Sequence, residues 1–205
     1  MNLLFRKLKA AWIVFWWGLA TALLGPLIAL TGSVSPTGNL AFRLCQAWVW
    51  IGRVIAGVRV EARGLERIRP GTAYVIVSNH QSLYDIPALM LGLGIQFRWV
   101  IKKELLYIPI FGQALWAARH VFIDRSSGKR AIKSIRRAMK KLPEGVSVAV
   151  FAEGTRSDDG TVQAFKRGGF MMALSRSLPI LPVTINGSWR VMPDKRSLSF
   201  HPGPI

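Results

Sequence analysis

An uncharged apolar run near the N-terminus constrains this chain more than any other feature. Residues 10–30 contain no charged side chain, and the run is about as long as a helix that crosses the hydrocarbon of a bilayer. Basic residues precede it, as in a secretory signal, but the run is longer than a signal core and rich in tryptophan. We therefore expect a retained helix that associates with a membrane.

A second apolar stretch, residues 40–60, follows a break rich in glycine, serine and proline, and arginines interrupt it. One spanning helix would leave basic residues on both sides of the membrane, against the usual positive-inside bias. A hairpin that dips into one leaflet returns both basic flanks to one side, with the bend supplied by Gly25-Pro26 and the polar break. We predict such a membrane-associating two-helix segment over residues 1–60, on the cytoplasmic face of the cell membrane. The alternative is a buried helical pair in a soluble protein.

The composition indicates an anionic partner. The chain carries 28 Lys and Arg against 10 Asp and Glu, a formal charge of +18, and 51% of its residues are hydrophobic. A charge of this sign attracts nucleic acid, an anionic leaflet or phosphorylated partners. Cys45 is the single cysteine, so an internal disulfide is excluded, and the histidines lack the paired spacing of metal ligands. We expect no metal.

From residue 61 the pattern changes to short apolar runs separated by helix-like segments. The runs are rich in β-branched and aromatic residues and apolar on both faces, as in a parallel sheet covered on two sides. They span residues 72–79, 97–102, 120–125, 146–154 and 179–187. Between them, residues 126–142 repeat apolar side chains at helical spacing, with lysines and arginines on the other face. The predicted fold is an α/β domain over residues 61–205, a mostly parallel sheet flanked by helices.

Four of the predicted strands end in polar side chains. These ends are Asn79-His80, Lys102-Lys103, Asp124-Arg125 and residues 153–156. Open parallel sheets bind ligands at the carboxyl ends of their strands. If the strands are neighbours, one base and several cations converge on one crevice.

His80 and Asp85 lie five residues apart just after the first of these strands. On a continuous helix this spacing points two side chains apart, so the pair is useful only across a strand-to-helix turn. An aspartate there can bind one imidazole nitrogen, fix the tautomer and leave the other nitrogen basic, able to take a proton from a hydroxyl. The alternative is that Asn79, Ser82 and Asp85 only cap a helix.

The segment FAEGTRS, residues 151–157, is a strand followed by a glycine-containing turn with Thr155 and Arg156. Backbone amides at such a turn and a guanidinium suit a phosphate. The spacing differs from a nucleotide-binding P-loop, so ATP is not implied, and an ordinary exposed turn is the alternative. Glu153 lies beside the proposed phosphate, where a positioning role is a hypothesis.

Together these segments resemble the glycerolipid acyltransferase family, and within it the bacterial 1-acyl-glycerol-3-phosphate acyltransferases. Four blocks match in order and spacing: NHQSLYD at 79–85, VFIDR at 121–125, FAEGTRS at 151–157 and LPVTI at 181–185. The connecting residues 101–115 also look similar. The resemblance runs from about residue 60 to the end, and the apolar N-terminal pair fits the family.

The resemblance implies transfer of an acyl group from acyl-CoA or acyl-carrier protein to the sn-2 hydroxyl of lysophosphatidic acid. His80 would be the general base and Asp85 would orient it, in direct attack on the thioester, so Ser82 and Cys45 need not be nucleophiles. The residues that match substrate-binding positions are Lys102, Arg125, Glu153, Gly154, Thr155 and Arg156. The implied partners are a lysophospholipid, the acyl donor and a membrane, with no cofactor beyond the donor. No oligomeric state is implied.

Two departures from the family pattern stand out. Ala152 replaces the family's proline, which changes backbone stiffness but not charge, and we expect little loss. The chain stops at residue 205, where related chains continue, so a terminal strand or helix of the domain could be absent.

Other functions stay open at this point. The blocks do not select the acceptor, which could be a lyso-ornithine lipid, another lysophospholipid or glycerol 3-phosphate. A membrane-anchored nucleic-acid-binding module would also be basic, but no helix-turn-helix, zinc-finger or RNP pattern occurs, so we expect no nucleic acid. The basic helix at 129–141 is expected to face an anionic leaflet or an acidic acyl donor, with an ordinary solvated face as the alternative.

Overall fold

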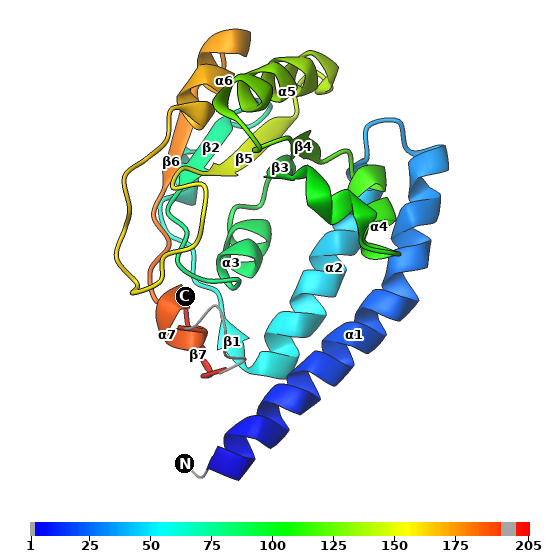
Figure 1. Ribbon diagram of the computed structural model, residues 1–205, viewed down its shortest axis with the longest axis vertical. Helices are drawn as coiled ribbons and strands as arrows, with labels where there is room; N and C mark the ends of the chain where they lie inside the picture. Colours follow the sequence, from blue (N-terminus) through cyan, green and yellow to red (C-terminus); the bar gives the residue numbers. More distant parts are fainter. Residues whose placement is uncertain (1–2, 194–199) are drawn as a thin grey trace.

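Five parallel strands form the central sheet of the computed structural model, which describes residues 3–193 and 200–205 (Figure 1). The strands are β2 (Val75–Ser78), β3 (Phe97–Lys102), β4 (Val121–Ile123), β5 (Ser147–Phe151) and β6 (Ile180–Val183), in the order β4-β3-β5-β2-β6. Every neighbouring pair is parallel, so the predicted parallel α/β sheet is confirmed. Most strands are shorter than the predicted runs because their polar ends leave the sheet to form loops.

Helices cover both faces of this sheet. They are α1 (Leu3–Val34), α2 (Asn39–Ala56), α3 (Asp85–Gly92), α4 (Phe111–Ala117), α5 (Gly128–Lys141), α6 (Gly168–Arg176) and α7 (Ser188–Val191), with 3-10 turns η1 (Leu65–Arg67) and η2 (Lys103–Tyr107). A separate parallel pair joins β1 (Val58–Arg59) to β7 (Gly203–Pro204). The helix predicted at 126–142 is present as α5.

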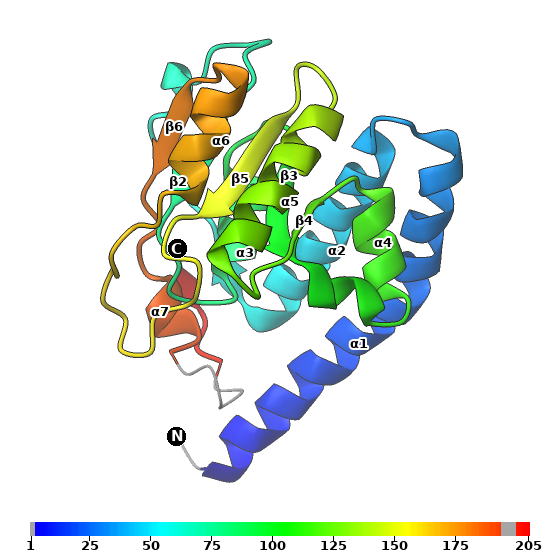
Figure 2. The ribbon, with the colours of Figure 1, turned by 45° about the horizontal axis from the view of Figure 1, so that its top comes forward.

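Successive residues of each strand point to opposite faces of the sheet, and each face has its own core. Ile76, Trp99 and Ala149 pack with buried residues of α2, α3 and α4. Val75 and Val148 pack on the other side, against α5 and α6 (Figure 2). A sheet buried on both faces explains why the strands read as continuous apolar runs.

The N-terminal helices α1 and α2 lie side by side and are joined by a short turn at residues 35–38 (Figure 1). The chain reverses in the polar break, as predicted. It does not reverse at Gly25-Pro26, because α1 continues through Pro26 as one helix. Proline removes one intrahelical hydrogen bond, and a long helix packed against α2 and α4 tolerates this loss.

One face of α1 is apolar and exposed. Its large side chains are Leu8, Trp12, Phe15, Leu19, Leu23, Leu27 and Leu30, spaced three or four residues apart along one stripe. Residues Lys7–Val34 are long and apolar enough to cross a membrane, and only 22% of the most apolar window is buried. A stripe of this size is unusual on a surface that faces water, and it supports a membrane-facing helix.

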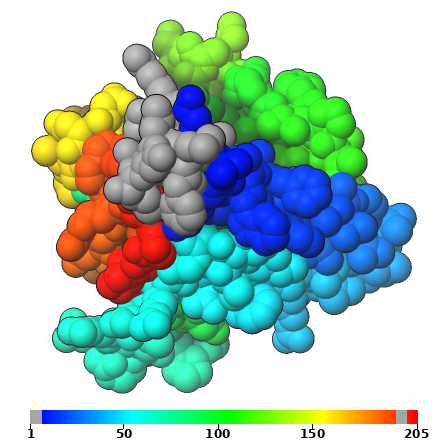
Figure 3. Space-filling view, turned by 90° about the horizontal axis from the view of Figure 1, so that it is seen from below, coloured from blue at the N-terminus to red at the C-terminus, as the bar shows by residue number. Residues whose placement is uncertain are grey.

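The other side of the helical pair packs on the rest of the chain. Phe42 and Val49 of α2 belong to the same core as α3 and the sheet. Nearer the N-terminus, Ile13 of α1 packs with Val58 and Phe200, and these segments meet on the face seen from below (Figure 3). The division of the chain into units at residue 60 stays a prediction.

Arg98 of β3 connects the sheet to the turn between α1 and α2. Its side chain is fully buried, and Nη2 donates to the carbonyl of Thr37 (2.7 Å) and to Oδ1 of Asn39 (2.6 Å). The guanidinium also lies 5.4 Å from the centre of the Phe42 ring. Burial lowers the pKa of Arg98 to about 10, so it stays charged at neutral pH.

Replacing Arg98 with methionine should therefore destabilise the protein. The substitution keeps apolar volume but removes two charge-assisted hydrogen bonds, to the carbonyl of Thr37 and to Oδ1 of Asn39, each worth about 1.5–3 kcal/mol. Thermal unfolding in detergent should show a lower Tm. Arg63, which is exposed, provides a matched control: Arg63→Met should leave the Tm nearly unchanged. Equal effects at both positions would contradict the assignment.

Candidate active site

The pairing of β2 with β5 sets two chemically active segments side by side. Ser78 is in register with Phe151, so the residues after each strand emerge together. The His80 ring stacks on the Phe151 ring, with centroids 3.7 Å apart and planes at 4°. The carbonyl of His80 accepts a hydrogen bond from the amide of Ser157 (2.9 Å). His80 is therefore fixed against the segment 151–157.

His80 and Asp85 meet as the spacing predicted. Nδ1 of His80 lies 2.8 Å from Oδ2 of Asp85, which also accepts from the amides of Gln81 (2.7 Å) and Ser82 (2.8 Å). The Asp85 side chain is fully buried, and that of His80 is 14% exposed. A carboxylate oxygen only accepts, so Nδ1 carries the proton and Nε2 keeps its lone pair.

Asp85 is the first residue of α3, yet it is not the N-cap, which is Tyr84. Its carboxylate turns back toward the loop of residues 80–82 and away from the free amides of the helix. The capping alternative therefore does not describe this aspartate, which holds the imidazole and its loop.

The side chain of Glu153 accepts hydrogen bonds from two backbone amides. Its Oε1 accepts from the amide of His80 (2.6 Å), and its Oε2 accepts from the amide of Gln163 (2.9 Å). The residue is 1% exposed and does not line the cavity in front of His80. This geometry supports the positioning hypothesis for Glu153, because both carboxylate oxygens accept hydrogen bonds from backbone amides.

The other predicted binding residues share one cavity with His80. They are Lys102, Arg125, Gly154, Thr155 and Arg156. Arg125 donates from Nη1 to the carbonyl of Gly154 (2.8 Å), which joins the ends of β4 and β5. A positive φ of 74° at Gly154 forms the turn that this contact needs. The cavity is thus lined by an imidazole and several cations.

Lys103 differs from its neighbour Lys102. Its Nζ lies 2.7 Å from Oδ2 of Asp124. Hydrogen bonds from Lys103 and Ser126 hold the pKa of Asp124 well below its usual range. Lys103 is therefore paired, whereas Lys102 lines the cavity.

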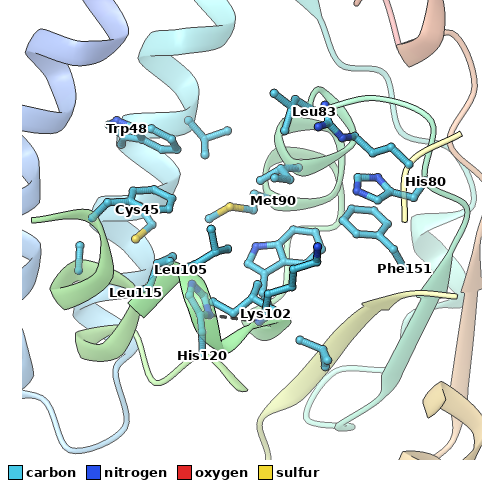
Figure 4. A pocket seen from close by; sticks show the side chains of 18 of the residues that line it. Cys45, Trp48, His80, Leu83, Met90, Lys102, Leu105, Leu115, His120 and Phe151 are labelled. Carbon is cyan, nitrogen blue, oxygen red and sulfur yellow. Dashed lines mark hydrogen bonds between the residues drawn. The ribbon is translucent and has the colours of Figure 1, made fainter. Parts of the chain in front are cut away.

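The cavity has a volume of about 400 Å³ and is mostly apolar (Figure 4). His80 and Phe151 lie at one end, and Cys45 and Trp48 of α2 lie at the other. Helices α1, α2, α3 and α4 all contribute walls, including Gly25, Ile28, Val49, Met90 and Ala114. This cavity could not be predicted from the sequence, because its lining looks like ordinary core in each separate segment.

His120 also lines the cavity, and no role was predicted for it from the sequence. The amide of Trp99 donates to its Nδ1 (3.1 Å), so the proton of the neutral ring is on Nε2. Burial, and to a lesser degree the charge of Arg98, lower the pKa of His120 to about 3. His120 is neutral at physiological pH. Among residues 3–193 and 200–205, no cluster of three His, Cys, Asp or Glu side chains could hold a metal.

The fold and this site define a class of enzyme. The Acyltransferase family model matches residues 59–186, which is more than half of the chain. The match includes both partners of the His80–Asp85 pair and the turn at 153–156. The chain belongs to the acyltransferase family.

Its relatives point to one branch of that family. The chain is 39% identical over 164 residues to the 1-acyl-sn-glycerol-3-phosphate acyltransferase of Pseudomonas aeruginosa, covering 78% of this chain and 62% of that protein. It is 38% identical over 135 residues to the alpha form of the human enzyme, covering 65% of this chain and 48% of that one. The chain thus spans less than two thirds of the length of these curated relatives.

A solved structure is similar to this protein over the whole length of the chain. The crystal structure of the 1-acyl-sn-glycerophosphate (LPA) acyltransferase PlsC from Thermotoga maritima matches with a TM-score of 0.80 and 28% identity. The match covers 100% of this chain and 83% of that one. The similarity therefore includes the N-terminal helical pair as well as the sheet.

The depressed pKa of His120 should make the protein sensitive to acid. Between the ordinary pKa of 6.5 and about 3, His120 is protonated in the unfolded chain but neutral in the folded chain. The free energy of unfolding therefore falls as the pH falls. His120→Asn keeps an acceptor for Trp99 but cannot titrate. The variant should show a shallower loss between about pH 6.5 and pH 4, by up to about 1.4 kcal/mol per pH unit. Urea unfolding across this range measures it, and identical slopes would rule the effect out.

Proposed function

We propose that the protein acylates the sn-2 hydroxyl of lysophosphatidic acid with the acyl group of a thioester, CoA-bound or carrier-bound. The product would be phosphatidic acid, made for phospholipid biosynthesis. One observation carries this proposal: an imidazole oriented by Asp85 lies at one end of a mostly apolar cavity that two arginines also line. The names of the similar proteins support the same acceptor.

The cationic rim suits the phosphate of the acceptor. Arg125 and Arg156 can form paired hydrogen bonds to phosphate oxygens, and Lys102 adds a point charge. Gly154 and Thr155, in the turn that precedes Arg156, line the same cavity as His80. A phosphate held there would bring the neighbouring glycerol hydroxyl toward the imidazole.

The reaction needs no covalent intermediate on the protein. Nε2 of His80 takes the proton of the hydroxyl as its oxygen attacks the thioester carbonyl carbon. The tetrahedral intermediate then collapses, the carbon–sulfur bond breaks, and the leaving thiolate takes the proton from the imidazolium. Asp85 stabilises that imidazolium, and stacking on Phe151 keeps the ring in place.

The position of Ser82 supports direct attack. Its hydroxyl is buried, donates to the carbonyl of Met192 (3.3 Å) and accepts from the amide of Tyr84 (3.2 Å). Ser82 does not line the cavity, so it is poorly placed as a nucleophile.

The apolar part of the cavity suits an acyl chain. It reaches Thr21 and Ile28 of α1 and Val49 of α2, the pair that carries the exposed apolar stripe. We infer that the helical pair inserts into one leaflet on the cytoplasmic side and that the lysolipid passes from that leaflet to His80. Mixed micelles with lysophosphatidic acid and either radiolabelled acyl-CoA or radiolabelled acyl-carrier protein test the reaction, and absence of phosphatidic acid with both donors would refute it.

Replacing His80 with alanine should nearly abolish turnover. General-base help is worth roughly a hundred- to ten-thousandfold, so kcat should fall by that factor while the fold and vesicle binding persist. Asp85→Asn should also lower kcat, because an amide can hold the wrong imidazole tautomer. Circular dichroism provides the folding control. Wild-type turnover in a folded His80→Ala variant would exclude the assigned base.

Arg156→Ala should act mainly on the acceptor. Losing charged hydrogen bonds to phosphate should raise the KM for lysophosphatidic acid about ten- to hundredfold, with a smaller effect on the KM of the acyl donor. Arg63→Ala, which changes an exposed arginine outside the cavity, is the matched control. An unchanged acceptor KM would count against the phosphate role.

A further inference from the structure

A second, larger hollow lies along the edge strand β4, and we call it the basic groove. Its volume is about 860 Å³, and Val121 and Phe122 of β4 form its floor. One wall is α5, and the other is formed by the α1–α2 turn, by Trp116 of α4 and by Arg119, which follows α4. Helix α5 and β4 lie next to each other at this edge of the sheet (Figure 2).

Positive charge predominates among the side chains that line the basic groove. Its lining cations are Lys103, Arg119, Arg130, Lys133, Arg137 and Lys141, and Asp124 is the acid that lines it. Asp124 is already neutralised by Lys103 at 2.7 Å. In the part of the chain that the structure describes, no cation of α5 forms an ion pair. Uncompensated like charges attract an acidic partner.

The basic groove adjoins the active site at the ends of two strands. At the end of β3, Lys102 lines the catalytic cavity and Lys103 lines the groove. At the end of β4, Arg125 lines the cavity and Asp124 lines the groove. His120 lines both. A partner bound in the groove is therefore one residue away from the rim where the thioester must react.

The shape of the groove selects among acidic partners. Its α5 cations, Arg130, Lys133, Arg137 and Lys141, follow one helix face over about 16 Å. An acidic helix presents carboxylates with this same spacing. Phe122, Trp116 and Leu142 add apolar surface, as in a protein interface. A flat leaflet does not fill a concave groove, and α5 packs on the sheet face opposite α2.

We propose that the basic groove docks an acidic helical protein that carries the acyl thioester, an acyl-carrier protein. This inference rests on the proposed function and assigns its protein-borne donor a surface. The carrier's helix lies between α5 and α4, and its flexible arm crosses the strand ends at Lys102 and Arg125 to bring the thioester to His80. Binding in the groove should not be needed for acyl-CoA, whose thioester reaches the cavity without the carrier.

The test compares two double variants of α5 with the same change of charge. Lys133→Glu with Arg137→Glu alters the groove, and Arg136→Glu with Lys140→Glu alters exposed cations of the same helix outside it. Each full-length protein is assayed in zwitterionic detergent micelles with palmitoyl-carrier protein and with palmitoyl-CoA. Thermal unfolding and binding to anionic vesicles are measured alongside.

The variant with Lys133→Glu and Arg137→Glu should lose about tenfold or more in kcat/KM with the carrier protein. With palmitoyl-CoA the loss in kcat/KM should be less than about twofold. For the variant with Arg136→Glu and Lys140→Glu, kcat/KM should change less than about twofold with either donor. Equal losses on both donors, equal losses in both variants, or a loss of vesicle binding alone would overturn the docking assignment. So would a wild-type protein that uses palmitoyl-CoA but not the carrier protein. No transfer from either donor would instead refute the proposed function itself.

Discussion

The parallel pairing of β2 with β5 is the constraint on which the site depends. These two strands lie in the middle of the sheet, and their register places Ser78 beside Phe151. The chain leaves both strands at the same point, so His80 emerges beside Glu153. A slip by one residue would turn each following side chain to the other face and separate the imidazole from Phe151. The two buried cores lock that register, because each strand is apolar on both faces.

Two buried carboxylates hold the loops that follow β2 and β5 in place. Asp85 binds the imidazole and two amides, and Glu153 binds the amides of His80 and Gln163. Both are almost inaccessible to solvent, where a charge is tolerated only when hydrogen bonds compensate it. Part of the candidate active site is therefore a network of backbone hydrogen bonds to these two buried carboxylates.

Local patterns predicted much of this structure. The strands, α5 and the α1–α2 turn follow from periodicity and from polar breaks, and the spacing of His80 and Asp85 required a strand-to-helix turn. The lateral order of the strands could not be predicted, because nothing in a single strand specifies its neighbour. The bonds of Glu153 and the lining of the cavity by Trp99 and His120 depend on contacts between distant segments. Pro26 looked like a bend because propensity does not include the packing of α1 on α2 and α4.

The helical pair has a consequence for how this protein can be handled. Thr21 and Ile28 of α1 and Cys45 and Val49 of α2 are walls of the cavity that His80 also lines. The N-terminal segment is thus a structural part of this cavity and cannot be treated as a detachable tether. A fragment that began after α2 would keep its imidazole and arginines, but its cavity would be open to water on one side.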